Sequence, residues 1–347
     1  MNSCFLKALD LKHTDRTPIW LMRQAGRYLP EYRKIRAKFT NFLDMCKNSD
    51  ICAELALQPI QRFDLDASIL FSDILTIPDA FDLELEFKDG EGPFFNNPID
   101  VVDKIRNLPD FDLEKVDYVF EAVRKTRFNL PSDIPLIGFC GSPWTLVAYS
   151  VEGGSSVQFE RTKKFIKNHP KEIHDLLKRY TLACFDYLKE QAKAGINAFQ
   201  IFDSWANLLS EDDFIDFSLK YSKALIDMLK ADEVTKKIPI ILFARDPRAQ
   251  LKIFKIKGIA CLSLYWNMDV QYARKIFEGK VAIQGNLNPA TLTKKDEDIE
   301  LELNNLLNQI HNYNGYIFNL GHGITPNIDP NKVSLLIQLI RNFNPTT

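Results

Sequence analysis

The sequence predicts an α/β fold, a single (β/α)8 barrel with an inserted hairpin, and two observations support this prediction. Eight short runs of almost wholly apolar residues recur along the chain without polar alternation, which is typical of parallel strands buried on both faces. Longer segments with helical periodicity lie between most of these runs. The predicted strands are residues 18–22, 67–71, 135–140, 198–202, 238–243, 260–264, 281–283 and 316–320.

The clearest predicted helix covers residues 171–194. The apolar side chains that recur there at helical spacing are Leu176, Leu177, Tyr180, Leu182 and Ala183. A second helix start is indicated by Ser210, a favoured N-cap residue that is followed by three acidic residues.

The insertion is predicted near residues 83–98, in the second strand–helix unit. Residues 83–87 alternate between apolar and acidic side chains, and Asp89-Gly90 is a turn signal, so we expect a hairpin. A barrel of this kind takes about 250 residues, which leaves room for an insertion within one domain spanning residues 1–347. The alternative is an open, doubly wound sheet, but no glycine-rich phosphate loop follows the first predicted strand.

Composition excludes several classes of function. Lys and Arg total 44 against 46 Asp and Glu, so the near-neutral chain gives no sign of nucleic-acid binding. No apolar run reaches membrane-spanning length, and the N-terminus does not resemble a secretory or transit signal. The six cysteines form no Cys-x-x-Cys pair, which predicts free thiols in a reducing, cytoplasmic compartment and no metal site.

Functional groups of such a barrel come from the carboxyl ends of its strands. Arg23 and Arg27 follow the first predicted strand, and they would share a face at i,i+4 if the segment were helical. Two guanidinium forks suit carboxylates, although surface arginines are the alternative. Asp73 follows the second strand in an apolar run, where a carboxylate is costly to bury unpaired. It could pair with one of these arginines or accept N–H bonds from a ligand, and both interpretations stay open.

Three further polar side chains lie near predicted strand ends. Tyr149 comes after the small-residue segment 138–146, and a tyrosine there is more often a core residue than a catalytic one. Ser204 follows the fourth strand. His322 lies between two glycines at the end of the eighth strand, exposed to whatever fills the mouth of the barrel.

Several of these segments resemble one family. Residues 18–33 (PIWLMRQAGRYLPEYR) are similar to the N-terminal signature of the uroporphyrinogen decarboxylases, and residues 138–146 (GFCGSPWTL) are similar to their second signature. Residues 71–75, 284–287 and 319–323 follow in the family's order and approximate spacing. The resemblance covers essentially the whole chain, and the arginine-containing signature is long enough to be very specific.

The resemblance implies a cofactor-free (β/α)8 barrel that acts as a homodimer in heme biosynthesis. Its substrate would be uroporphyrinogen III, a macrocycle of four pyrroles with four acetate and four propionate groups. The acetates would become methyl groups, which gives coproporphyrinogen III and CO2. By matching position, the resemblance assigns substrate binding to Arg23, Arg27, Arg36, Phe42, Asp73, Tyr149, Ser204 and His322.

The resemblance also implies catalytic roles for Asp73, Arg23 and Tyr149. Asp73 would lie beneath the macrocycle and accept its pyrrole N–H groups, while Phe42 packs on the ring and Arg36 is a further basic residue near the cleft. A pyrrole protonated on carbon can receive the electrons that loss of CO2 leaves behind, and a fixed carboxylate would stabilise that cation. Arg23 with a bound water, or Tyr149, is the candidate proton donor.

The sequence departs from the family pattern at four places. Tyr265 stands where Asp is usual, Asn288 stands where Asp usually follows Asn-Leu, and Asn207 replaces a usual Gly. Residues 245–247 (RDP) are an atypical end to the fifth strand. None of these changes removes a residue with an implied catalytic role.

Two other functions compete with this one. A zinc-dependent methyltransferase of the same barrel superfamily would need Cys and His ligands that converge at the strand ends. Cys140 is the only cysteine at a predicted strand end, and His322 has no cysteine two residues on. A tetrapyrrole-binding or storage protein would keep the pocket without the chemistry.

Overall fold

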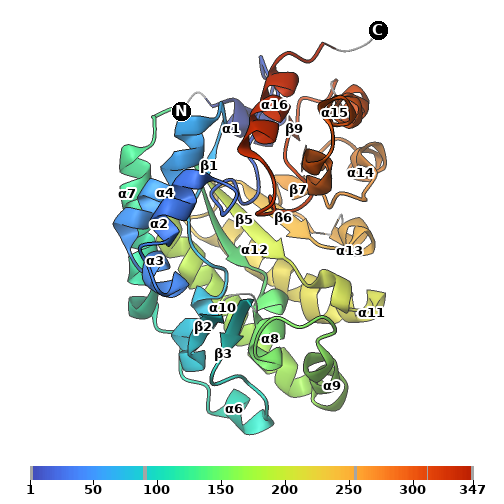
Figure 1. Cartoon of the computed structure of the whole chain (residues 1–347). Helices are drawn as coiled ribbons and strands as arrows, with labels where there is room; N and C mark the ends of the chain where they lie inside the picture. The colour runs from blue at the N-terminus through green and yellow to red at the C-terminus, as the bar shows by residue number, and fades with distance from the viewer. Residues whose placement is uncertain (1–2, 89–91, 254–255, 311, 345–347) are drawn as a thin grey trace.

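The computed structural model describes residues 3–88, 92–253, 256–310 and 312–344. A curled sheet of parallel strands lies at the centre, and helices cover its outside (Figure 1). The seven strands follow one another across the sheet in chain order. They are β1 (Ser68–Ile69), β4 (Leu136–Gly141), β5 (Ala198–Asp203), β6 (Ile240–Ala244), β7 (Cys261–Ser263), β8 (Ala282–Gln284) and β9 (Tyr316–Ile317).

The segment 18–22 lies between the first and last strands of this sheet. Ile19 forms a parallel bridge with Phe318, which donates its backbone N–H to the Pro18 carbonyl at 2.8 Å. On the other side, the backbone N–H of Asp66 donates to the Ile19 carbonyl at 2.8 Å. These contacts bring the two edges of the sheet toward each other.

The strand predicted at residues 18–22 is reduced to this single bridge. Beyond it, side-chain amides replace neighbouring backbone as hydrogen-bond partners. The backbone N–H of Leu21 donates to Gln24 Oε1 at 3.2 Å, and that of Met22 donates to Asn319 Oδ1 at 2.9 Å. A ladder cannot continue where its N–H groups are already used.

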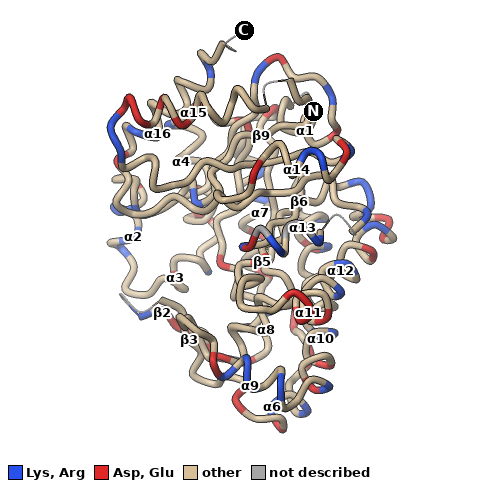
Figure 2. The backbone as a smooth tube through the Cα atoms, turned by 90° about the vertical axis from the view of Figure 1, so that its right-hand side faces the viewer, with Lys and Arg blue, Asp and Glu red and all other residues tan. Residues whose placement is uncertain are grey.

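The helices surround the sheet, and Figure 2 shows basic and acidic positions dispersed over them. The α-helices are α1 (Cys4–Leu9), α2 (Pro30–Arg36), α3 (Phe42–Cys46), α4 (Ser49–Arg62), α5 (Thr76–Pro78), α6 (Val102–Arg106), α7 (Asp117–Asn129), α8 (Pro143–Glu152), α9 (Glu160–Asn168), α10 (Pro170–Ala194), α11 (Glu211–Asp213), α12 (Lys220–Ala231), α13 (Pro247–Lys252), α14 (Val270–Ile276), α15 (Asp296–Ile310) and α16 (Pro330–Arg341). Shorter or irregular turns are η1 (Asp79–Leu83), η2 (Leu113–Val116), η3 (Ala206–Leu208), η4 (Phe214–Leu219) and η6 (Pro289–Thr293). Within the described ranges, no helix combines the length and the apolar character needed to cross a membrane.

Two local predictions about helices are confirmed. Helix α10 buries Leu176, Leu177, Tyr180 and Ala183 as its spacing indicates, whereas Leu182 is 55% exposed and does not belong to the buried face. The helix ends at Gly195, whose φ of 117° suits a residue without Cβ. The Ser210 hydroxyl caps α11 by accepting the backbone N–H of Asp213.

An antiparallel pair of strands lies within the predicted insertion. Strand β2 (Leu85–Lys88) pairs with β3 (Gly92–Phe95), and the predicted Asp89-Gly90 turn lies outside the described residues. In Figure 1 this pair lies at the lower end of the molecule, whereas the two chain termini lie at the upper end.

The interior of the sheet is packed in layers. At the amino ends of the strands, the buried aromatic ring of Phe5 from α1 joins a cluster with one inward side chain from each of several strands. The strand members of this cluster are Ile137, Ala198, Ile241, Cys261, Ala282 and Ile317. Above them lies a polar layer, in which Gln284 accepts from the Trp20 indole N–H at 2.6 Å and donates to Ser263 Oγ at 3.0 Å. The central space is therefore filled by side chains at this end.

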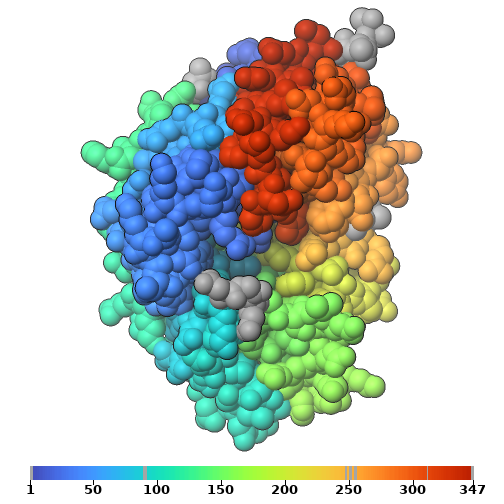
Figure 3. Space-filling model, viewed as in Figure 1, coloured from blue at the N-terminus to red at the C-terminus, as the bar shows by residue number. Residues whose placement is uncertain are grey.

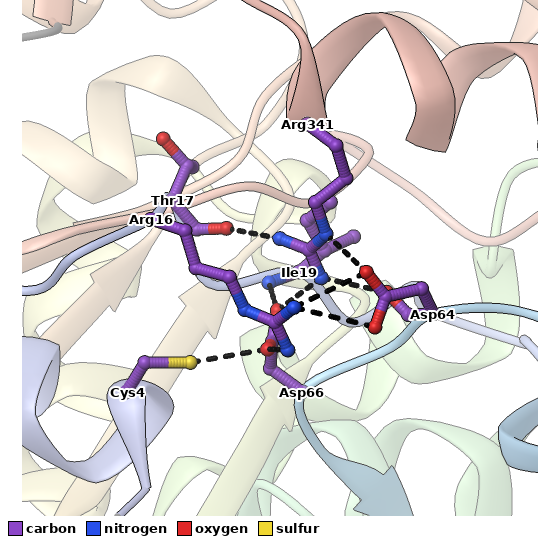
Figure 4. A network of polar contacts seen from close by, with 7 residues as sticks. All are labelled: Cys4, Arg16, Thr17, Ile19, Asp64, Asp66 and Arg341. Atoms are coloured by element: carbon purple, nitrogen blue, oxygen red, sulfur yellow. Dashed lines mark hydrogen bonds and ion pairs between the residues drawn. The ribbon is translucent and has the colours of Figure 1, made fainter.

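A polar network fastens the same end of the molecule (Figure 4). Its centre is Asp66, which is only 2% exposed. The carboxylate accepts from Arg16 at 2.5 Å, from Arg341 at 2.7 Å and from the backbone N–H of Ile19 at 2.7 Å. Burial and the adjacent carboxylate raise the pKa of the Cys4 thiol, which donates to Asp66, to about 11. The network joins the N-terminal segment, the start of β1 and the last helix.

We expect Arg341→Met to lower the free energy of unfolding by about 2 kcal/mol, because it leaves the buried Asp66 with one of its two guanidinium partners. Urea denaturation of the variant and of the parent protein measures the difference. The control is Arg124→Met, which removes an exposed pair with Glu121 and should cost about 0.5 kcal/mol or less. Equal losses in the two variants would show that the network contributes no more than a surface pair.

Candidate active site

The carboxyl ends of the parallel strands form one edge of the sheet, which we call the mouth. The face drawn in Figure 3 is hollowed where the blue N-terminal part of the chain, the red C-terminal part and the yellow-green middle part meet. Segments that follow different strands supply the polar side chains of the mouth. They include Arg23, Asp73, Tyr149, Ser204, Arg245 and His322.

Arg23 reaches the mouth through a left-handed backbone conformation, with φ of 63°. Its aliphatic stem lies against Gly323, where an added Cβ would come within 2.4 Å of the Arg23 Cδ. Only glycine at position 323 leaves room for this side chain.

The helical arrangement considered for Arg23 and Arg27 is not present. Both residues lie in turns, and α2 begins only at Pro30. Arg27 is exposed, and its carbonyl accepts from the Arg33 guanidinium at 2.8 Å. The left-handed conformation of Arg23 breaks the helical path. The two guanidiniums therefore do not share a helix face.

Asp73 follows the end of β1 and is partly buried. Its Oδ1 accepts the backbone N–H of Leu75 at 2.8 Å. Burial raises the pKa of the carboxyl, while the Leu75 hydrogen bond and the positive charge of Arg23 act in the opposite direction. Among the described residues Asp73 forms no ion pair, so structural pairing with Arg23 or Arg27 is not what holds it there.

Tyr149 lies on α8, which starts at Pro143 within the small-residue segment 138–146. Its ring packs edge-on against Trp205 at 5.6 Å and Phe159 at 6.0 Å between ring centroids. Burial raises the pKa of the phenol, and the nearby charges of Asp73 and Arg23 act on it with opposite signs. The phenol therefore stays protonated at neutral pH.

The segment 138–146 positions α8 and so has a structural task. Ser142 caps the helix by accepting the backbone N–H of Thr145 at 3.0 Å. An added Cβ at Gly141 would meet the Leu146 side chain at 2.6 Å, so the turn depends on a small residue.

His322 lies between two glycines that are closely packed, Gly321 against the backbone of Trp266 and Gly323 against the side chain of Arg23. An added Cβ at Gly321 would lie 2.3 Å from the backbone nitrogen of Trp266, and the Trp266 ring centroid is 5.9 Å from that of His322. Burial, together with the charges of Arg23 and Arg245, lowers the pKa of the imidazole to about 4. The ring is consequently neutral at pH 7 and offers one donor and one acceptor.

Phe42 and Arg36 lie on the hairpin side of the mouth. The Phe42 ring is 4.7 Å from that of Phe87 on β2 and 6.3 Å from that of Phe71 beside β1. Arg36 is partly buried and donates to the Phe39 carbonyl at 2.6 Å. Phe42 thus connects the hairpin to the end of β1.

Ser204 directly follows β5, and a residue that the sequence reasoning left without a role precedes it. Asp203 is buried and accepts from Thr145 Oγ1 at 3.0 Å and Ser218 Oγ at 2.5 Å. Burial raises the pKa of its carboxyl to about 6. These contacts fix the end of β5 next to Ser204. The two hydroxyl groups that bind Asp203 come from residues distant in the sequence, so no local pattern indicated the role of Asp203.

Arg245 is the second residue that sequence reasoning missed. It follows β6, and its guanidinium carbon lies 5.5 Å from the centroid of the Trp205 ring. The only signal in the sequence was the atypical end of the fifth predicted strand.

Residues 1–343 match the family model described as Uroporphyrinogen decarboxylase (URO-D). The chain belongs to the uroporphyrinogen decarboxylase family. Relatives named uroporphyrinogen decarboxylase support this with 45% identity in Legionella pneumophila strain Corby and 44% in Acinetobacter baylyi. Each alignment covers 99% of this chain and 97% of the relative. Family membership makes the chain an enzyme, a carboxy-lyase of porphyrin biosynthesis.

A solved structure shares the fold with this member of the decarboxylase family. A methyltransferase from Methanosarcina mazei matches with a TM-score of 0.78 at 17% identity, over 97% of this chain and 98% of the other. At that identity the likeness concerns the fold alone. The alternative of a methyltransferase function gains no support from the site, because the described residues contain no group of three His, Cys, Asp or Glu side chains that could hold a metal. The six cysteines are free thiols, as predicted.

The departures from the decarboxylase pattern are accommodated locally. Tyr265 stacks on Trp266 with 3.8 Å between ring centroids, so an aromatic ring stands where the family usually has a carboxylate. Asn288 caps η6 by accepting the backbone N–H of Ala290 at 3.0 Å, which an aspartate would do equally well. Asn207 is exposed and does not have a positive φ, so its side chain imposes no backbone strain.

Proposed function

We propose that this enzyme removes the four acetate carboxylates of uroporphyrinogen III, giving coproporphyrinogen III and CO2 without a metal or cofactor. The observation that carries the proposal is the carboxylate of Asp73. It lies at a strand end within reach of the Arg23 charge, and within the described residues only one of its two oxygens accepts a hydrogen bond. The other oxygen is available to a ligand.

The raised pKa of Asp73 fits a carboxylate whose remaining hydrogen-bond donors would come from a ligand. Burial disfavours the ionised carboxylate. Pyrrole N–H groups would supply the missing hydrogen bonds and restore the charge. As a ring carbon takes up a proton, the pyrrole becomes cationic, and the fixed carboxylate stabilises the positive charge that develops. Loss of CO2 then places its electron pair in the pyrrole ring.

Two groups are candidates to protonate the ring. Tyr149 keeps its phenol proton at neutral pH, and Arg23 could present a bound water. Arg23 would also hold the reacting acetate, with Ser204 and the neutral His322 as further hydrogen-bonding groups. Arg27, Arg36 and Phe42 would hold the periphery of the macrocycle.

We also propose that the fold is a complete barrel of eight strand–helix units. Residues 18–22, with their bridge to Phe318 and their bond from Asp66, would act as the first of eight strand–helix units in one domain spanning residues 1–347. The β2–β3 pair would be an insertion in the second unit. The enzyme would work in the cytoplasm as a homodimer with the two mouths near each other.

We expect the purified protein to convert uroporphyrinogen III to products with seven, six, five and finally four carboxylates. Anaerobic incubation followed by separation of the oxidised products by carboxylate number measures this. Exhaustive chelation should leave the rate unchanged. Activity that chelation abolishes and only zinc restores would contradict the mechanism, and tight binding without any decarboxylation would indicate a binding protein.

A further inference from the structure

Arg245 is placed in the mouth by the pairing of β5 with β6. Its backbone N–H donates to the Asp203 carbonyl at 3.0 Å, which extends the ladder by one residue beyond the end of β6. The guanidinium lies on the ring of Trp205, and Trp205 in turn packs against Tyr149. Arg245 is therefore connected to a candidate catalytic residue through a single aromatic side chain.

The guanidinium of Arg245 has no anionic partner within the described part of the chain. The neighbouring carboxylate of Asp246 is occupied by Arg248, which donates its backbone N–H at 2.7 Å and its Nη2 at 2.9 Å. The carboxylate of Asp203 is occupied by two hydroxyl groups. A partly buried guanidinium without an acceptor is costly to the folded protein, and an anionic ligand would offset this cost.

Arg245 acts on the same part of the mouth as Arg23. The positive charges of both residues lower the pKa of His322, although they follow segments on different sides of the sheet. A carboxylate bound near His322 would be attracted by both positive charges.

We propose that Arg245 binds a propionate of the tetrapyrrole and helps to determine its specificity; this inference rests on the proposed function. Arg245 follows β6, which lies three strands along the sheet from β1, the strand that precedes Asp73. Arg23 would hold the reacting acetate, so the carboxylate at Arg245 is a second one on the macrocycle. The longer propionate reaches the rim, and it persists through all four decarboxylations.

The contact with Trp205 is a cation–π contact, with 5.5 Å between the guanidinium carbon and the ring centroid, and it uses none of the guanidinium N–H groups as hydrogen-bond donors. Paired N–H groups of a guanidinium can bind a carboxylate in bidentate fashion. Contact with the indole restricts the side chain before the substrate arrives, which reduces the entropy lost on binding.

The test compares Arg245→Met and Arg245→Lys with the control Arg248→Met, an exposed neighbour that pairs with Asp246. Met retains contact with Trp205 but has no charge. We expect Arg245→Met to raise KM about tenfold or more, the scale of one lost charge-assisted contact, with kcat within about twofold. Arg245→Lys should give a smaller rise in KM, and the control should match the parent.

Two substrates identify the bound group. A propionate contact predicts the same rise in KM for the octacarboxylate substrate and for the pentacarboxylate intermediate, because both carry all four propionates. A rise confined to the octacarboxylate would overturn the propionate assignment. An unchanged KM for both substrates in a folded Arg245→Met protein would overturn the carboxylate contact itself.

A second readout separates a charge effect from loss of structure. In Arg245→Met, NMR titration should show the pKa of His322 rising above its value of about 4, since one of the two cations that lower it is gone. An unchanged His322 pKa would contradict the placement of Arg245 in the mouth. If the parent protein fails to decarboxylate, the proposed function fails, and weaker binding of uroporphyrin by Arg245→Met still tests the contact by fluorescence.

Discussion

Asp73→Asn should lower the turnover of uroporphyrinogen at least about a hundredfold, the scale on which one preorganised electrostatic group contributes to catalysis. The substitution keeps size and removes charge. It also replaces one acceptor oxygen by a donor that would oppose the pyrrole N–H groups. The protein should fold normally, because removing a buried carboxylate that has no ion-pair partner among the described residues need not destabilise it.

Single-turnover kinetics together with circular dichroism check this expectation. A matched control is Asp112→Asn, since Asp112 makes the same kind of contact, accepting the backbone N–H of Glu114 at 2.9 Å, on an exposed turn. The control should retain the parent rate. Near-normal turnover in a folded Asp73→Asn protein would show that the carboxylate serves only its local bond to Leu75.

Arg23→Lys should lower kcat by about tenfold to a hundredfold, the cost of weakening one charge-assisted contact that matters in the transition state. Lysine keeps the charge but loses the bidentate fork. Arg23 is the arginine whose charge acts on Asp73, Tyr149 and His322, so it should meet the reacting acetate.

Arg27→Lys is the companion variant and should mainly raise KM. Both arginines are exposed, but Arg27 lies four residues farther from the end of the segment 18–22, so we expect it to hold the periphery of the substrate equally in the ground and transition states. Steady-state kinetics on both variants decide between these roles. The reversed pattern would remove Arg23 from the reacting group and leave both residues as substrate binders.

The sequence predicted those features that depend on local pattern. Apolar runs marked the strands because both faces of the sheet are covered, and the periodicity of α10 matched its buried face. At residues 18–22 the structure has a single bridge, because the backbone N–H of Met22 donates to Asn319, about three hundred positions along the chain. The residues around Met22 contain no pattern that predicts a hydrogen-bond partner so distant in the sequence.

For the candidate site, too, local pattern predicted some residues, and the others depend on contacts between distant segments. Asp73, Tyr149 and His322 could be selected because strand ends converge in a barrel. The side chain of Arg23 needs the space beside Gly323, and the partners of Asp203 come from two other segments. In the sequence, Arg245 is recognisable only as part of an atypical strand end. Its role depends on Trp205 and His322, which are distant in the sequence and which the fold brings close to it.

The position of residues 18–22 between β1 and β9 has a consequence for synthesis of the protein. Among the described residues, the backbone of this segment bonds to Asp66 on one side and to Phe318 and Ile324 on the other, and nearly the whole chain separates Ile19 from Phe318. During translation the sheet therefore remains an open half-barrel with two unpaired edges, and such edges invite pairing with other chains. Contacts of such high sequence separation also form slowly. The ion pairs of Arg341 with Asp64 and Asp66 can form only after α16 leaves the ribosome, so nascent chains of this enzyme should depend on chaperones until the last helix has been made.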